Sequence, residues 1–226
     1  MPIGSIGLII AVVLVYFGVA ERVLDRMRLS DRAALIFLGL VLAGSFVNLT
    51  LVGAPYELRI NLGGGVIPLG FIVWLGATAG TARERWRALI AALVTGGAIY
   101  ALGRVLPSGE PGNWVIDPTY LFGLVGGVIG YLAGRSRRAA FIAGIGGTIL
   151  ADLVTYVANR GAGLAGRSWV GGGGAFDSVF IAGFIAVGLA ELVGETRELL
   201  QGGPRRGPER PPGLSGVGGR EGRKNR

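Results

Sequence analysis

The sequence predicts an all-α protein, a polytopic bundle of about seven transmembrane helices with the N-terminus outside and the C-terminus in the cytoplasm. Hydrophobic residues make up 51% of the 226-residue chain and charged residues only 16%, whereas a soluble domain carries about 25% charged residues. The apolar residues form separate runs close to the ~20 residues that a helix needs to cross a bilayer. Arg and Lys are concentrated in every second connection between these runs.

The first predicted span is Ile3–Ala20. A secretory signal peptide would carry Arg or Lys before its apolar run. None precedes this run, and the first charged residues, Glu21 and Arg22, follow it. We therefore expect a helix that stays in the membrane and is inserted with its N-terminus outward.

Six further apolar runs complete the predicted bundle. The run that contains Gly63–Gly65 and Pro68 is expected to cross with a distorted first half. Gly126, Gly130 and Gly134 recur at intervals that allow close backbone approach, so the last three spans are expected to pack together. The runs are Ala33–Gly53, Leu62–Ala82, Ala88–Leu106, Pro118–Gly134, Ala139–Asn159 and Ala175–Val193.

The distribution of Arg and Lys predicts the orientation. Eighteen of them lie in the C-terminal tail and in the connections after the first, third and fifth spans. The excess of Arg and Lys marks the cytoplasmic side of a membrane protein. The opposite, outer side carries four: Arg59, Arg104, Arg160 and Arg167.

The predicted bundle covers residues 1–194, and residues 195–226 form a basic cytoplasmic tail. Eight Gly, four Pro and seven Arg or Lys lie between residues 202 and 226. This composition buries too little apolar surface to compensate for ordering, so the tail is expected to be disordered. It either contacts anionic lipid headgroups or is a solvated appendage.

Residue types that are missing from the chain exclude several kinds of site. There is no Cys and no His, which excludes disulfides, iron–sulfur clusters and the usual zinc, haem and copper sites. No cofactor and no metal is predicted. The single Lys, Lys224, lies in the tail, so no span offers a lysine for a retinal Schiff base. The net charge of +8 comes mostly from the tail, so nucleic acid is not a predicted partner.

Asp152 is the polar residue of the spans that most needs an explanation. It lies thirteen residues after Ala139 in the sixth span, and an ionisable residue inside a span is by default a functional candidate. Its helical face also carries four polar residues at compatible spacing: Thr148, Thr155, Tyr156 and Asn159.

The directions of the spans bring further polar residues to the outer end of the bundle. The candidates for binding a solute or an ion there are Asn48, Asn61, Arg104, Asp117, Asp152, Tyr156 and Asp177.

Each of these features also has a plain structural interpretation. Asp152 could fix the helix register, Asp117 and Asp177 could cap helix starts, and Arg104 could extend to the membrane interface. The glycine clusters Gly63–Gly65 and Gly171–Gly174 flank the same region, where they either expose backbone N–H groups to an anion or simply turn the chain.

Four segments resemble a family of prokaryotic multi-spanning membrane proteins, the domain of unknown function numbered 1614. The resemblance implies membrane residence and places Asn61, Asp117, Asp152 and Asp177 in recurring segments, but it implies no activity. The segments are INLGGGVIPLG (60–70), DPTYLFGLVGGVIGYL (117–132), GGTILADL (146–153) and GGGGAFDSVFIAGFIAV (171–187).

Three functions compete. The first is a multi-pass cell-membrane permease or binding protein for a small solute or ion, with its polar site in the outer part of the bundle. The second is a non-catalytic membrane scaffold or assembly partner. The third is an intramembrane aspartyl protease that pairs Asp152 with Asp177, but the Tyr-Asp, Gly-x-Gly-Asp and Pro-Ala-Leu motifs of such proteases are missing. The residue pattern therefore favours a protein that is not an enzyme.

Overall fold

The computed structural model describes residues 18, 31–78, 81–105, 118–134 and 136–200. The chain divides into two units, Met1–Glu191 and Leu192–Arg226. Most of the described residues are helical, which confirms the predicted helical class. The helices are α2 (Asp31–Gly44), α3 (Ile67–Ala77), α4 (Ala82–Val105), α5 (Pro118–Gly134), α6 (Arg137–Gly161) and α7 (Ser178–Leu200), with a π-helical turn η1 (Leu62–Val66) and a 3-10 turn η3 (Gly174–Phe176).

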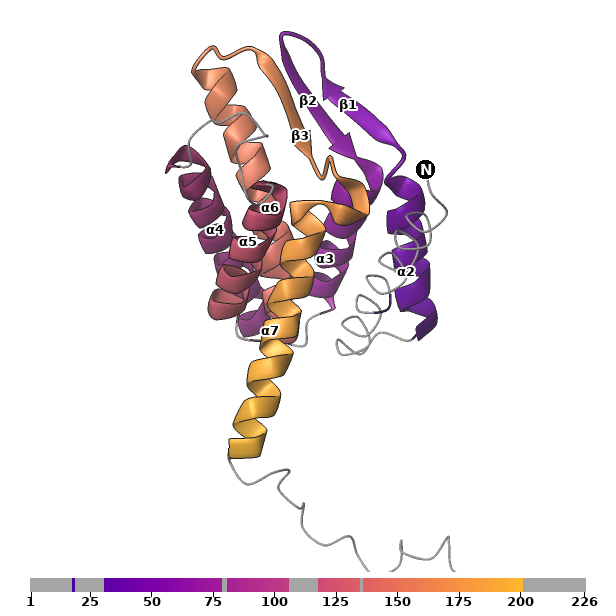
Figure 1. Ribbon diagram of the computed structural model, residues 1–226, viewed down its shortest axis with the longest axis vertical. Coiled ribbons are helices and arrows are strands. Elements are labelled where there is room, and N and C mark those ends of the chain that lie inside the picture. The colour runs from indigo at the N-terminus through magenta and orange to yellow at the C-terminus, as the bar shows by residue number, and fades with distance from the viewer. Residues whose placement is uncertain (1–17, 19–30, 79–80, 106–117, 135, 201–226) are drawn as a thin grey trace, which may run out of the picture. The chain divides into compact units, whose positions relative to one another are not determined.

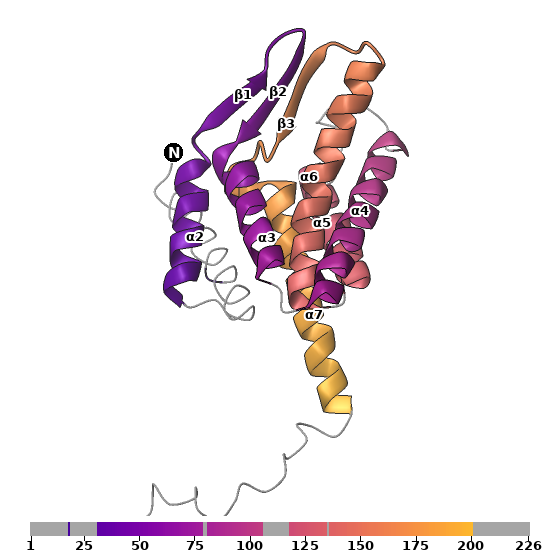
Figure 2. The same ribbon diagram turned by 180° about the vertical axis from the view of Figure 1, so that it is seen from behind.

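Within the first unit the helices stand side by side, and a small sheet lies at one end of them (Figures 1 and 2). Helices α4, α5 and α6 lie together on one side, and α2 lies on the other. The sheet has the order β1-β2-β3, with an antiparallel β1–β2 pair and a parallel β2–β3 pair. Its strands are β1 (Asn48–Val52), β2 (Tyr56–Asn61) and β3 (Gly166–Val170).

The predicted second span, Ala33–Gly53, is wrong in its last part. Helix α2 ends at Gly44, and the chain continues into β1, which pairs Asn48 with Asn61. The end of the helix packs closely on η1, where a Cβ on Gly44 would lie only 2.8 Å from the backbone N of Gly63. A short apolar run such as Leu49–Val52 fits a strand as well as a helix. Asn48 therefore lies at the start of a strand and not inside a helix.

The other predicted spans agree better with the observed helices. Helix α5 has the predicted bounds, and α6 encloses the predicted sixth span. The distorted start of the third span is confirmed as η1, which is followed by α3 with Pro68 in its first turn. The predicted first span, Ile3–Ala20, lies outside the described residues except for Gly18, which is helical. Residues 201–226 of the tail also lie outside them.

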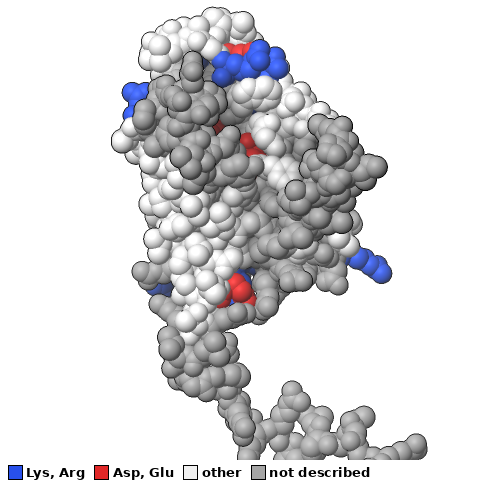
Figure 3. Space-filling model, viewed as in Figure 1, with Lys and Arg blue, Asp and Glu red and all other residues white. Residues whose placement is uncertain are grey.

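Two helices of the described part, α4 and α6, are long and apolar enough to cross a membrane. Shorter apolar helices cover Arg32–Gly44, Leu62–Ala77, Leu121–Gly134 and Ser178–Gly194. On the face shown in Figure 3, most charged side chains gather near the two ends of the first unit, with a broad uncharged region between them.

Helix α6 forms the centre of the bundle, and its Phe141 and Ile145 are fully buried. The predicted close packing of the last spans is confirmed at Gly144, where an added Cβ would lie 2.7 Å from the carbonyl oxygen of Ala182 in α7. Aromatic rings connect α6 to the other side of the bundle. Phe71 of α3 meets Phe141 edge-on at 5.7 Å and stacks on Phe37 of α2 at 4.2 Å between ring centroids.

Candidate functional site

The two glycine clusters pack against each other where the sheet joins the helices. A Cβ on Gly64 would lie 2.2 Å from the carbonyl oxygen of Gly171, and a Cβ on Gly171 would lie 2.2 Å from the carbonyl carbon of Gly64. Gly171 also has a φ of +65°, a backbone angle that residues other than glycine rarely adopt. We call this contact the glycine crossing. It explains the clusters as a close backbone contact between η1 and the segment that follows β3.

Asn61 is buried beside the glycine crossing, and the residue is only 1% exposed. Its Nδ2 donates to the carbonyl oxygen of Ser45 at 2.8 Å and to Oδ1 of Asn48 at 2.9 Å. Its Oδ1 accepts from the N–H of Gly64 at 2.8 Å. The side chain of Asn61 thus connects the end of α2, the strand β1 and the turn η1 through hydrogen bonds inside the protein.

Ser45 extends this network to η3, the 3-10 turn just before α7. Its hydroxyl donates to the carbonyl oxygen of Val41 at 2.7 Å and accepts from the N–H of Ala175 at 2.9 Å. Ser45 was not predicted from the sequence, because no local pattern marks a contact between residues 130 positions apart.

Asp177 caps the start of α7. Its Oδ1 accepts from the N–H of Val179 at 3.0 Å and from the hydroxyl of Ser178 at 3.2 Å. Its Oδ2 accepts from the N–H of Gly173 at 2.8 Å. The capping interpretation of Asp177 is therefore confirmed, and both carboxylate oxygens have hydrogen-bond donors without any ligand.

Asp152 projects from α6 toward the same region and is half-buried. The backbone N–H of Gly171 faces its carboxylate, and the carboxylate of Asp177 is near enough to interact with it electrostatically. The glycine crossing thus presents a backbone donor to Asp152. The structure brings together two acidic residues that lie 25 positions apart in the sequence.

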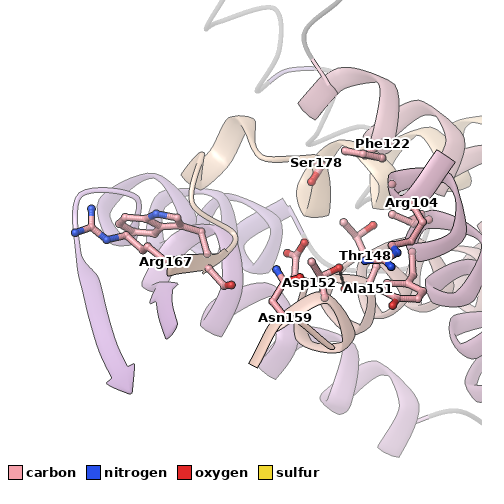
Figure 4. A pocket seen from close by; sticks show the side chains of 14 residues that line it. Arg104, Phe122, Thr148, Ala151, Asp152, Asn159, Arg167 and Ser178 are labelled. Atoms are coloured by element: carbon pink, nitrogen blue, oxygen red, sulfur yellow. Dashed lines mark hydrogen bonds between the residues drawn. The ribbon is translucent and has the colours of Figure 1, made fainter. Parts of the chain in front are cut away.

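Asp152 lines a cavity of about 370 Å³ between α4, α5, α6, β3 and α7. Arg104 enters it from α4, Phe122 from α5 and Trp169 from β3. Figure 4 shows Asp152 and Asn159 next to each other, with Arg104 on the far side of the same space. Asp152 and Arg104 do not form an ion pair with each other. The cavity therefore contains a carboxylate and a guanidinium that face a common space.

Arg167 also lines this cavity, but its guanidinium points away from it (Figure 4). Its Nε contacts Oε2 of Glu57 at 2.6 Å, and the Nε of Arg59 contacts Oε1 of Glu57 at 2.5 Å. Hydrogen bonds from Arg167 and then from Arg59 lower the pKa of Glu57 below its ordinary value. Two of the four outer arginines are thus paired on the sheet.

Tyr156 lines a second cavity of about 110 Å³, together with Tyr56 and Arg160. The hydroxyl of Tyr156 accepts from Nη1 of Arg160 at 3.2 Å and donates to the carbonyl oxygen of Tyr56 at 3.4 Å. Asn159 and Ser168 line both cavities. Tyr156 therefore lies next to the larger cavity without lining it.

The family described as "Protein of unknown function (DUF1614)" matches residues 42–189. The chain belongs to this family. The predicted resemblance is thereby confirmed, and the match contains the glycine crossing, Asp152 and every residue that lines the larger cavity. No curated protein and no solved structure matches the chain.

The predicted ligand-binding residues of this DUF1614 protein lie in separate parts of the structure. Arg104 and Asp152 line the larger cavity, and Asp177 is near enough to Asp152 to interact with it electrostatically. Asn48 and Asn61 belong to the hydrogen-bond network on the η1 side of the glycine crossing. Asp117 lies outside the described residues. Their roles in binding a ligand stay predictions.

Three contributors to the DUF1614 site were not predicted. Ser168 and Trp169 reach the larger cavity from β3, and Glu57 pairs with the arginines of the sheet. The strand β2 could have been predicted from Tyr56–Ile60, where apolar and charged residues alternate as they do in a strand.

Proposed function

We propose that this DUF1614 protein is a multi-pass protein of the cell membrane that binds a small solute with opposite charges and lets it permeate. The observation that carries the proposal is the presence of Asp152 and Arg104 in the lining of one cavity of about 370 Å³. This volume lies within the range of roughly 300–1,000 Å³ that is usual for small-molecule sites. The cavity also offers the amide of Asn159 and the hydroxyls of Thr148 and Ser178.

Membrane residence is supported by the outer surface of the helices. On α4, Leu89, Ile90, Leu93 and Val94 are all at least half exposed. A contiguous apolar surface of this kind is unusual on a soluble monomer and suits contact with lipid. We therefore propose that α4 and α6 cross the bilayer as two of seven spans.

The orientation follows from the positive charges. Arg59, Arg160 and Arg167 lie at the sheet end of the first unit, whereas the arginines at the start of α4 and α6 belong to the side that is rich in Arg and Lys. The excess of Arg and Lys identifies the cytoplasmic side. The sheet and the larger cavity are then on the outer side of the membrane.

The chemistry of the proposed site follows from its two charged groups. A carboxylate that is partly removed from water is costly unless it has partners, and the Gly171 N–H supplies Asp152 with one. An ammonium group of a solute would supply another. The guanidinium of Arg104 suits a carboxylate or phosphate group at the other end of the same solute, because it presents several donors in a plane.

Ligand-induced thermal stabilisation of the full chain in detergent tests this proposal. The probes are glycine as a zwitterion, methylammonium as a cation and acetate as an anion. A ligand that binds only the folded protein raises its melting temperature. We expect glycine to stabilise most, Asp152→Asn to abolish the response to glycine and methylammonium, and Arg104→Gln to weaken the response to glycine but not to methylammonium.

Glu84→Gln is the matched control, because it replaces another carboxylate by an amide at the start of α4, far along the helix from Arg104. It should leave every response unchanged. An unaltered glycine response in folded Asp152→Asn, or no response of the wild type to any of the three probes, contradicts the proposal. Uptake of labelled glycine into proteoliposomes then separates permeation from binding alone.

A role as an assembly partner is the second candidate, and β1 favours it. This strand is an edge of the described sheet. Leu51 within it is 58% exposed, and Phe46 just before it is 83% exposed. Exposed apolar edge strands are templates for pairing with another chain. If assembly through β1 is the function, Leu51→Lys should change the oligomeric state in detergent while Asp152→Asn leaves it unchanged.

A further inference from the structure

A groove lies between the first two turns of α4 and the end of α5, remote from the Asp152 cavity. It has a volume of about 800 Å³ and is lined by Arg83, Trp86, Arg87, Ile90 and Ala91 of α4 and by Ala133 of α5. The five residues of α4 recur at the spacing of a single helical face. They therefore form one continuous stripe along the helix, and Ala133 closes it from the side.

The chemistry of this stripe changes along the helix axis. Arg83 and Arg87 are one turn apart at its start, with the 65% exposed indole of Trp86 between them. Ile90 lies about 10 Å along the helix axis from Arg83, at 1.5 Å per residue, and is 57% exposed. The order cation, indole, apolar side chain along a helix is typical of a membrane interface, where Trp lies at the level of the lipid headgroups.

The two arginines have no acidic partner among the described residues. Arg59 and Arg167 share Glu57, and Arg137 pairs with Glu191. Arg85, which lies between Arg83 and Arg87 in sequence, donates to the carbonyl oxygen of Ala77 and is absent from the groove. Arg83 and Arg87 thus leave two guanidiniums at one end of the groove available for an anion.

The apolar end of the groove is open because small residues form it. Ala91 and Ala133 leave space that a larger side chain would fill. A free phosphate ion would occupy only the arginine end. A ligand that fills the whole groove must have an anionic head and an apolar tail.

We propose that this groove binds an anionic phospholipid. Its phosphate contacts Arg83 and Arg87, its glycerol region lies at Trp86, and one acyl chain follows Ile90 and Ala91 toward Ala133. This site differs from any contact of the basic tail with lipid, because it lies on α4 and α5. It requires that α4 spans the bilayer and does not depend on what the Asp152 cavity binds.

Lipid selectivity of the purified full chain tests this site. The number of lipids retained is measured by native mass spectrometry in mixtures of phosphatidylglycerol and phosphatidylcholine. We expect a clear preference for phosphatidylglycerol. Interfacial arginines are each worth roughly 1 kcal/mol toward anionic lipid, so each of Arg83→Gln and Arg87→Gln should weaken binding about fivefold, and the double variant about 30-fold.

Two further variants separate this site from general charge attraction. Arg85→Gln removes one charge from the same connection but none from the groove, so it should keep the preference. Ala133→Phe keeps all charges but fills the apolar end, so it should weaken phosphatidylglycerol binding while leaving the melting temperature in phosphatidylcholine within a few degrees of the wild type.

The competing results are distinct. An unchanged preference in the double variant, or an equal loss in Arg85→Gln, overturns the proposed site. Inorganic phosphate that displaces phosphatidylglycerol completely at millimolar concentration, with no effect of Ala133→Phe, would indicate an ion site instead and would also overturn it.

Discussion

Gly64 and Gly171 touch through their backbones, so closely that a Cβ on either residue would lie 2.2 Å from a backbone atom of the other. The same Gly171 directs its N–H toward the carboxylate of Asp152. Gly171 therefore contributes both to the packing of the fold and to the candidate site.

Gly171→Ala should destabilise the protein strongly. The new methyl group would collide with the backbone of Gly64, and the φ of +65° adds strain. We expect a loss of about 3 kcal/mol or more in the free energy of unfolding, measured as a fall in melting temperature in detergent.

Gly163→Ala is the matched control, because Gly163 has a φ of +71° but no atom within 4 Å of the added Cβ. It should cost only about 1 kcal/mol. Equal losses in the two variants would mean that backbone strain, and not the contact, makes glycine necessary.

Asn61→Asp should destabilise the fold although the side chain keeps its shape. The amide of Asn61 donates to the Ser45 carbonyl and to Asn48 Oδ1. An aspartate replaces the donating Nδ2 by an oxygen, which would face the Ser45 carbonyl oxygen and Asn48 Oδ1 and repel both. Leaving a buried polar group without its hydrogen bonds costs about 1–3 kcal/mol of stability. Asn48→Ala removes only one of these contacts at an exposed residue, so its effect on the melting temperature should be smaller. A larger effect of Asn48→Ala would contradict the central position of Asn61 in the network.

Glu57 should make the sheet sensitive to acid. Arg167 and Arg59 lower its pKa in the folded protein below the ordinary value of about 4.5. The stabilisation is therefore complete above that ordinary value and is lost as the pH falls through the lowered pKa of the folded state. Glu57→Gln should melt below the wild type at pH 7, and the two melting temperatures should converge toward pH 3. A difference that stays constant from pH 7 to pH 3 would show that the ion pairs with Glu57 do not contribute to stability.

The proposed orientation has a direct test, because the chain contains no cysteine. Thr50→Cys lies on the exposed strand β1, and Thr81→Cys lies just before α4. A membrane-impermeant maleimide should label Thr50→Cys in intact cells, whereas Thr81→Cys should react only after permeabilisation. Labelling of both positions in intact cells would place the start of α4 outside and would remove the basis for seven spans.

The elements that could be predicted from the sequence are those whose bounds depend on local residue preferences rather than on long-range contacts. Pro118 and Gly134 bound α5 as expected, since local backbone preferences at helix ends suffice there. Gly63–Gly65 and Pro68 correctly indicated a distorted third segment. The depth of Asp152 and Asp177, inferred from the direction of their helices, correctly suggested that they share a region of the bundle.

The sheet could not be predicted from hydropathy. Residues after Gly44 continue an apolar run, and a run of that length does not separate strand from helix. Strand β3 pairs with β2 across more than a hundred residues, and no local periodicity reports such a contact. Asn48 and Asn61 were predicted to bind a ligand because the directions of the predicted spans bring both to the outer end of the bundle. Their hydrogen bonds to Ser45 and Gly64 became visible only when η1 and the end of α2 were placed together.

The parallel pairing of β2 with β3 sets an order for biogenesis. Glu57 and Arg167 are 110 residues apart, so the β1–β2 hairpin leaves the ribosome long before the strand that completes the sheet. At about 5–20 residues per second, the interval is roughly 5–20 s. During this time the inner edge of β2 has unpaired backbone groups, and α3, α4, α5 and α6 must all be made before β3 can cover it. The nascent protein therefore passes through a stage in which the β1–β2 hairpin has been made but its partner strand has not.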